Sequence, residues 1–113
     1  MTDAEAIVQR QLDAYNAKDL EGWLLTYSPE AQQFELHGAL LASGHDEMRR
    51  RMAARFEEPD LHAKLLRRIV MGHLVLDHEL ITRNFPEGKG SVEMLCIYEV
   101  RNGTISKASF AVP

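Results

Sequence analysis

The second half of the sequence holds several side chains that could do chemistry. Asp77-His78-Glu79 has the residue types of a metal site. On a strand, however, Asp77 and Glu79 point to the face opposite His78, so the triplet does not predict metal binding. Cys96 has no identifiable neighbour that would lower its pKa, and we interpret it as a small buried hydrophobic residue. No Ser-His-Asp spacing, phosphate loop or dinucleotide fingerprint occurs, so any reaction is expected to need no cofactor.

Two polar residues of the first half are placed where they could face a ligand. A helix predicted over residues 2–18 has an apolar stripe that includes Gln11. An amide on this stripe either bonds a nearby carbonyl or points into a pocket. Glu35 falls in a strand predicted over residues 32–37, where it is either a pocket carboxylate or an exposed group at the strand end.

The composition excludes several classes of function. The 113 residues, 45% of them hydrophobic and 27% charged, predict a single domain over residues 1–113. A net charge of −4 argues against nucleic acid or an anionic membrane as partner. The single cysteine and the lack of a signal-like or long apolar segment favour the cytoplasm.

The elements that position these side chains begin with three helices. Thr2 and Glu5 form a capping box for the first, and Asp19 caps a short second helix. The second helix is expected to end at Ser28-Pro29 and to carry an aromatic and aliphatic row, Leu20, Trp23, Leu24 and Tyr27. After a loop over residues 38–42, Ser43 caps a third helix. Its inner side chains are Met48, Met52 and Phe56, and those mostly outside are Arg49, Arg50 and Arg51.

Long strands follow the helices. Residues 61–71 and 74–83 are predicted to pair through a turn at Gly72-His73, and residues 86–90 form a loop. In the first of these strands one parity is apolar, which predicts a single inner face for Leu61, Ala63, Leu65, Ile69 and Met71. This order of elements indicates an α+β fold.

The last stretch, residues 91–112, predicts a hairpin with a type I′ turn at Asn102-Gly103. Continuous pairing from that turn places one set of residues on one face: Met94, Cys96, Tyr98, Val100, Ile105, Lys107, Ser109 and Ala111. The other face receives Leu95, Ile97, Glu99, Ser106, Ala108 and Phe110. Both faces are apolar at their centres, so we expect one to meet the chain's own helices and the other a second subunit.

The run IVQRQLDAYNAKDLEGWLLTYSPEAQQFEL, residues 7–36, resembles the opening of the nuclear-transport-factor-2-like superfamily, especially its ketosteroid-isomerase and SnoaL-like branches. The helix break at residues 16–20, the Ser43-Gly44 helix entry and the closing hairpin agree with it. The resemblance implies a cone-shaped domain of cystatin-like fold, in which a strongly curved antiparallel sheet wraps around N-terminal helices. It also implies a pocket inside the cone and a homodimer through the outer sheet face, here Leu95, Ile97, Ala108 and Phe110.

The same resemblance predicts a site for a small apolar ligand. The pocket would be formed by Gln11, Tyr15, Trp23, Glu35, Met52, Met94, Cys96, Tyr98 and Ser109. Glu35 aligns with the catalytic base of the ketosteroid isomerases, whereas Gln11 and Cys96 replace their oxyanion-binding tyrosine and aspartic acid. A thiol is a weak hydrogen-bond donor, and losing one good oxyanion donor costs on the order of 10²–10³ in rate.

Two classes of function follow from this set of residues. The first is a cofactor-free isomerase, cyclase or dehydratase acting on a small apolar carbonyl compound, with Glu35 as the base and Gln11 as a hydrogen-bond donor. The second is a non-enzymatic ligand-binding or dimerisation module. A cavity of roughly 300 Å³ or more would favour a ligand site over a packed cone.

Overall fold

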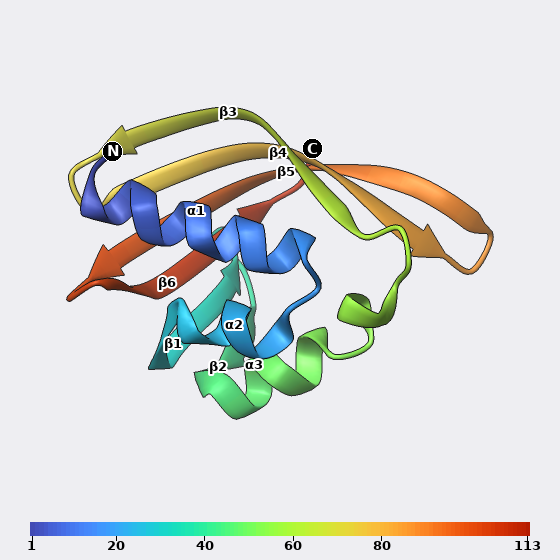
Figure 1. The fold of residues 1–113 in the computed structure, drawn as a ribbon, viewed down its shortest axis with the longest axis horizontal. Helices are drawn as coiled ribbons and strands as arrows, with labels where there is room; N and C mark the ends of the chain where they lie inside the picture. Colours follow the sequence, from blue (N-terminus) through green and yellow to red (C-terminus); the bar gives the residue numbers. More distant parts are fainter.

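A computed structural model describes all residues, 1–113, as three α-helices and six strands (Figure 1). The helices and a short 3₁₀ turn are α1 (Asp3–Asn16), α2 (Leu20–Leu25), α3 (Gly44–Met52) and η1 (Arg55–Glu57). The strands are β1 (Tyr27–Glu35), β2 (Leu40–Ser43), β3 (His62–Met71), β4 (Leu74–Phe85), β5 (Gly88–Arg101) and β6 (Thr104–Ala111). No helix combines the length and the apolar character needed to span a membrane.

The strands form one curved sheet in the order β2-β1-β6-β5-β4-β3, and α1 lies across its concave side (Figure 1). This is the predicted α+β, cystatin-like fold. All neighbouring strands are antiparallel except β1 and β6, which run parallel. The exception arises because the last strand inserts between β1 and β5 instead of adding to an edge.

The helices begin where the capping residues predicted. The Thr2 hydroxyl accepts a bond from the Glu5 backbone N–H at 3.1 Å, and the Asp19 carboxylate accepts one from the Gly22 N–H at 2.9 Å. Asn16 closes α1 and exchanges two bonds with the Ala63 backbone, of 3.0 and 2.8 Å. These bonds hold the end of α1 against β3, so the inner face of α1 is fixed over the sheet.

Three boundaries differ from the prediction. Tyr27 begins β1 instead of ending α2, because it pairs with Ile105 of β6. Residues 40–43 form a strand, β2, since they hydrogen-bond to β1, and only Pro86-Glu87 remains as the turn between β4 and β5. The predicted loops are therefore shorter because strand pairing extends into both of them.

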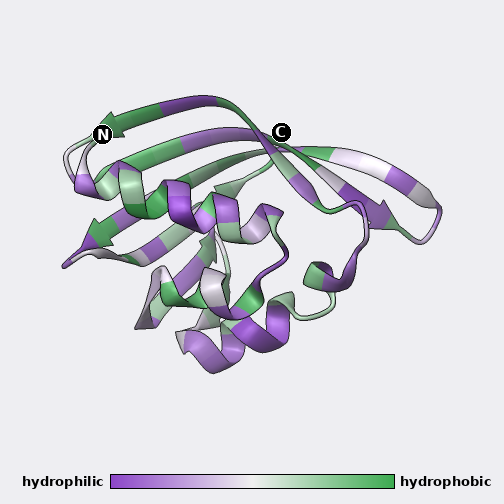
Figure 2. Cartoon of the chain, in the orientation of Figure 1, coloured by the Kyte–Doolittle hydropathy of each residue, from purple (hydrophilic) through white to green (hydrophobic).

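A β-bulge changes the inner face of β3. Leu65 pairs with Glu79 and Arg67 with His78, so Leu66 is the extra residue. Beyond the bulge the parity reverses: Ile69 and Met71 are 55% and 70% exposed. The predicted single apolar face is therefore wrong past Leu65. Figure 2 shows that the end of β3 next to its turn is hydrophobic.

A second bulge changes the last hairpin. The turn is as predicted, with positive φ at Asn102 and Gly103 and with Val100 opposite Ile105. Ser106 is then extra, and Glu99 pairs with Lys107. The one-residue shift reverses every later position on β6, because successive side chains point to opposite faces.

The shift corrects three assignments. Ala108 and Phe110 pair with Tyr98 and Cys96 on the inner face, so they do not belong to the outer face predicted for dimerisation. Ser109 pairs with Ile97 on the outer face and does not line the pocket. Leu95 and Ile97 remain on the outer face, as expected.

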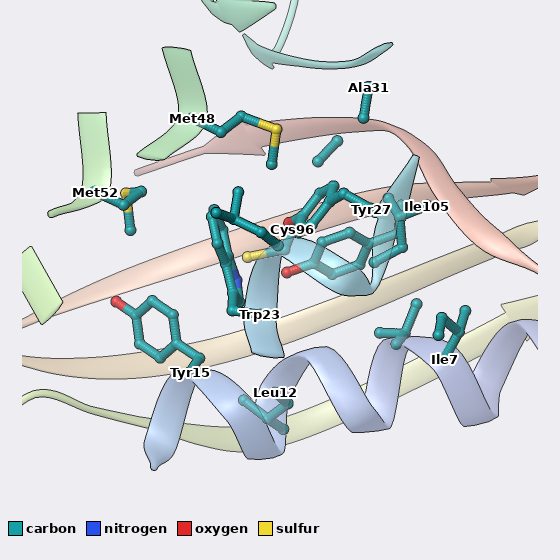
Figure 3. Packing of buried hydrophobic residues seen from close by; sticks show 14 of the residues in the cluster. Ile7, Leu12, Tyr15, Trp23, Tyr27, Ala31, Met48, Met52, Cys96 and Ile105 are labelled. Carbon is teal, nitrogen blue, oxygen red and sulfur yellow. The ribbon is translucent and has the colours of Figure 1, made fainter. Parts of the chain in front are cut away.

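The core lies between the inner sheet face and the helices. In Figure 3, Leu12 and Tyr15 from α1 and Met48 and Met52 from α3 approach the Trp23 indole from different sides. Trp23 also contacts Tyr27, with ring centroids 4.9 Å apart and ring planes tilted by 57°. Large aromatic and sulfur-containing side chains thus frame the inner end of the cone, and they leave space between them for a cavity.

Candidate functional site

A cavity of about 550 Å³ lies between the concave sheet face and the helices. Its wall has 23 residues, of which 16 are hydrophobic. The volume exceeds the roughly 300 Å³ that a small-molecule site requires. A largely apolar wall with a few polar groups is the usual composition of such a site.

The wall contains eight of the nine side chains that the sequence assigned to the pocket. They are Gln11, Tyr15, Trp23, Glu35, Met52, Met94, Cys96 and Tyr98. The ninth, Ser109, faces the opposite side of the sheet because of the β6 bulge. The wall also contains residues that the sequence did not indicate, namely Gln33, Arg51, Arg55, Glu79 and Arg83.

Glu79 is the buried carboxylate of this wall. It sits on the inner face of β4 with only 4% of its surface exposed. The Cys96 thiol donates to Glu79 Oε1 across 3.6 Å, and Oε2 has no hydrogen-bond partner within the protein. No salt bridge involves this residue. Burial, with a smaller contribution from Asp77, raises the pKa of Glu79 to about 7.

Asp77 lies two residues before Glu79 on the same inner face, but its charge is compensated. Arg68 Nε and Nη2 donate to its two carboxylate oxygens at 2.7 and 2.9 Å. Arg68 Nη1 also donates to Gln9 Oε1 at 2.8 Å. His78 points to the outer face, where it contacts Glu93 at 2.6 Å. The triplet therefore diverges as the strand geometry predicted.

The sequence could have drawn attention to Glu79. Strand alternation already put Asp77 and Glu79 together on the face opposite His78. The inner face of β4 was ambiguous, because Leu74, Leu76 and Leu80 make the other face equally apolar. The sequence therefore did contain a signal, a carboxylate within an apolar strand. Glu79 could have been predicted as a cavity residue if the inner face of β4 had been known.

Glu35 occupies a different environment from the one expected of a base. Its side chain is exposed at the mouth of the cavity. The chain turns immediately after it, since the Gly38 N–H donates to the Glu35 carbonyl at 2.9 Å. The expected burial of this carboxylate in an apolar pocket is therefore not observed, because Glu35 is the last residue of β1 and its side chain is exposed.

The tyrosine hydroxyls and the cysteine thiol of the cavity are protonated at neutral pH. Burial raises the pKa of Tyr15 to about 12 and raises the pKa values of Tyr27 and Tyr98 as well. Burial also raises the pKa of the Cys96 thiol well above its usual value. The three phenols are consequently hydrogen-bond donors at neutral pH, and Cys96 is not a thiolate nucleophile.

Unpartnered polar atoms concentrate at this cavity. Six buried side-chain atoms have no hydrogen-bond partner within the protein: Gln11 Oε1, Trp23 Nε1, Tyr27 Oη, Gln33 Nε2, Arg55 Nε and Glu79 Oε2. All six belong to residues of the cavity wall. Each buried polar group without a partner costs about 1–3 kcal/mol, so these atoms favour a polar occupant of the cavity, either water or a polar ligand group.

Comparison with known proteins identifies the family. Residues 8–108 match the model of the SnoaL-like domain. The chain belongs to this family. The nuclear-transport-factor-2-like superfamily that the opening residues resembled is thereby confirmed. No curated protein matches the sequence.

Solved structures show the same SnoaL-like architecture. An uncharacterised cystatin-fold protein from Novosphingobium aromaticivorans is 23% identical, with a TM-score of 0.87 and 98% of each chain covered. The Δ5-3-ketosteroid isomerase from a Mycobacterium species is 14% identical, with a TM-score of 0.85 over 100% of this chain and 95% of the isomerase. A protein of ketosteroid-isomerase-like fold from Catenulispora acidiphila, in complex with trimethylamine, is 14% identical, with a TM-score of 0.76 over 93% and 83%.

The family and the cavity together define the coarse role of this chain. A SnoaL-like domain whose inner space is about 550 Å³ and mostly apolar is a small-molecule-binding domain. Its specific chemistry depends on the polar groups of its own wall, because one fold of this kind hosts many functions.

Proposed function

We propose that this SnoaL-like domain binds a small, largely apolar carbonyl compound and moves a proton on it, with Glu79 as the general base and acid. The observation that carries the proposal is the Glu79 carboxylate itself: it is buried, has one free oxygen in the cavity wall, and lacks a cationic partner. A pKa near 7 suits both halves of a proton transfer at neutral pH.

The proposed reaction begins at a carbon next to the carbonyl. Glu79 takes a proton from this carbon, the C–H electron pair forms a C=C bond, and the carbonyl π electrons move onto oxygen to form an enolate. In a ligand with a β,γ C=C bond this enolate is a dienolate, and the protonated Glu79 returns the proton to the γ carbon. The β,γ π electrons form the new C–H bond, the C=C moves to the α,β position and the C=O bond re-forms, which completes an isomerisation. No cofactor or co-reactant is required, since the same proton leaves and returns.

The forming enolate oxygen needs hydrogen-bond donors. Gln11 and Tyr15 are one turn apart on α1, at positions i and i+4, and both line the cavity. Tyr15 keeps its proton at neutral pH, so its hydroxyl can donate to the enolate. We therefore assign the oxyanion-binding role to Gln11 and Tyr15, with the carbonyl of the ligand directed toward α1.

Glu35 remains the competing candidate for the base, because it is the carboxylate that aligns with the base of the ketosteroid isomerases. Its exposure at the cavity mouth favours a role in ligand entry over proton abstraction. The two glutamates are matched in chemistry and differ in environment, so the same substitution at each position distinguishes them.

The Kemp elimination of 5-nitrobenzisoxazole tests the proposal without knowledge of the natural substrate. This probe reacts when a carboxylate in an apolar pocket removes a carbon-bound proton. We expect Glu79→Gln to lower kcat/KM by about 10²-fold or more, because a positioned general base contributes roughly 10²–10⁴-fold. Glu35→Gln should change it by less than about twofold. A large loss with Glu35→Gln and none with Glu79→Gln would assign the base to Glu35 instead.

A second proposal concerns assembly: we infer that the outer sheet face forms a homodimer. Leu95 and Ile97 lie on this face, and Ile97 is linked across Leu76 of β4 to the exposed Ile69 of β3. An exposed apolar patch of this kind is typical of an interface between subunits. Light scattering should give the dimer mass for the wild type and the monomer mass for Ile97→Glu. A monomeric wild type at micromolar concentration would contradict the assignment.

A further inference from the structure

Three arginines lie in the wall of the cavity, and only one of them has an acidic partner. Arg83 is held by Glu58 through two parallel bonds, Nε to Oε1 at 2.9 Å and Nη2 to Oε2 at 2.8 Å. This fork neutralises the Arg83 charge. Arg51 and Arg55 take part in none of the salt bridges of the protein.

Arg51 was expected outside α3, but it turns into the cavity wall. Its Nη1 donates to the Gln33 amide oxygen at 2.9 Å and contacts the Met52 sulfur at 3.6 Å. Its guanidinium also lies 5.9 Å from the centre of the Phe110 ring. All three partners are neutral, so Arg51 is positioned by polar and aromatic contacts while its charge remains uncompensated.

Arg55 adds a second charge without a salt-bridge partner one helical turn further on, and the only acid that acts on it is Glu58, which is already bound to Arg83. It belongs to η1, and its Nε is buried with no hydrogen-bond partner within the protein. Burial, followed by repulsion from Arg55, lowers the pKa of Arg51, so the two guanidinium groups act on each other. Two like charges in a half-buried wall are unfavourable unless an anion lies between or beside them.

The acidic residues of the cavity do not fill this role. The cation that acts on Glu79 is Arg68, which is itself bound to Asp77. Glu35 is exposed at the mouth and bonds neither arginine. Besides Glu35 and Glu79, the charged groups of the wall are Arg51, Arg55 and Arg83, and Arg83 is paired with Glu58. The wall therefore carries a localised positive region apart from Glu79.

We propose that Arg51 and Arg55 form a subsite for a carboxylate, so that the ligand of this cavity is an apolar ring compound with a carboxylate at one end. Planar guanidinium groups suit the two oxygens of a carboxylate. The hydrophobic wall takes the ring system, and the end away from the carboxylate reaches Glu79. The inference rests on the proposed function only in assigning the ligand to the same cavity.

Calorimetric titration with two matched probes tests this subsite. 2-Naphthoate carries the carboxylate, and 2-acetonaphthone has the same rings with a neutral acetyl group. We expect the wild type to bind 2-naphthoate at least about tenfold more tightly, because a charge-assisted bond contributes about 1.5–3 kcal/mol. Arg51→Gln and Arg55→Gln should each lose most of this preference and leave 2-acetonaphthone binding within about twofold.

Controls separate the subsite from general effects of charge and folding. Arg50→Gln removes an exposed arginine next to Arg51 and should leave both affinities unchanged. Arg51→Lys keeps the charge without the planar fork and should retain part of the preference. Thermal unfolding shows whether each variant is folded.

Two results would overturn the carboxylate subsite. Equal affinity of the wild type for the two probes would overturn it while leaving ligand binding by the cavity intact. Unchanged 2-naphthoate affinity in both Arg51→Gln and Arg55→Gln would do the same. Failure of the Glu79 proposal is seen separately, as an unaltered Kemp elimination in Glu79→Gln with carboxylate binding preserved.

Discussion

Two carboxylates on the same face of β4 have opposite surroundings. Asp77 is fully buried and binds Arg68 through a bidentate pair. Glu79, two residues along the strand, is buried in the cavity wall and has only the Cys96 thiol as a partner. Both residues lie in β4 and point to the same face, so the difference in their surroundings comes from the side chains that face them.

This difference separates a structural acid from a chemical one. A buried acid bound to a cation holds elements together, here β3, β4 and α1 through Arg68 and Gln9. A buried acid without a cation has a raised pKa and an oxygen available to a ligand. The same contrast applies to Arg83, which Glu58 neutralises, and to Arg51, which no acid neutralises.

Removing the cation from Asp77 should have the largest effect on stability. Arg68→Gln leaves a fully buried carboxylate without charge compensation, which typically costs about 3–5 kcal/mol. Urea unfolding at pH 7 measures the loss. Arg67→Gln, an exposed neighbour on the same strand, should change the free energy of unfolding by less than about 0.5 kcal/mol. A loss below about 1 kcal/mol for Arg68→Gln would mean that Asp77 is not held by this pair.

Removing the charge from Glu79 should increase stability, in contrast to the loss expected for Arg68→Gln. Its folded pKa of about 7 exceeds the ordinary value of 4.5, so between these values the folded state keeps a proton that the unfolded state has lost. Wild-type stability therefore falls as the pH rises through this window. At pH 8 Glu79→Gln should be more stable than the wild type by about 3 kcal/mol, and at pH 4 the two should be nearly equal.

The smallest effect is expected at the exposed glutamate. Glu35→Gln should differ from the wild type in the free energy of unfolding by less than about 0.5 kcal/mol, because no buried charge is removed. Urea unfolding from pH 4 to pH 8 compares the three proteins directly. A stabilisation by Glu35→Gln equal to that by Glu79→Gln would remove the distinction between the two sites.

Local chemistry predicted much of the fold. The caps at Thr2 and Asp19 and the Asn102-Gly103 turn are encoded by single residues with specific backbone roles, and each is found as predicted. The helical stripe placed Gln11 and Tyr15 correctly, because a helix has one period throughout. The family resemblance then indicated which of the remaining side chains face the interior.

The errors come from features that no local pattern encodes. A bulge at Leu66 and another at Ser106 each add one residue, and each reverses the faces of everything beyond it on that strand. Ser109, Ala108 and Phe110 were misassigned for this reason. Glu79 was overlooked because both faces of β4 are apolar, and only tertiary packing decides which one is covered.

Titration of the Glu79 carboxyl group by ¹³C NMR tests the central claim most directly. The side-chain carboxyl resonance that disappears in Glu79→Gln belongs to this residue, and its chemical shift against pH gives its pKa. We predict a midpoint near 7, since the carboxylate is buried without a cation. A midpoint near the ordinary 4.5 would show that the group is solvated or paired in solution, and it would contradict the assignment of Glu79 as the acid-base residue.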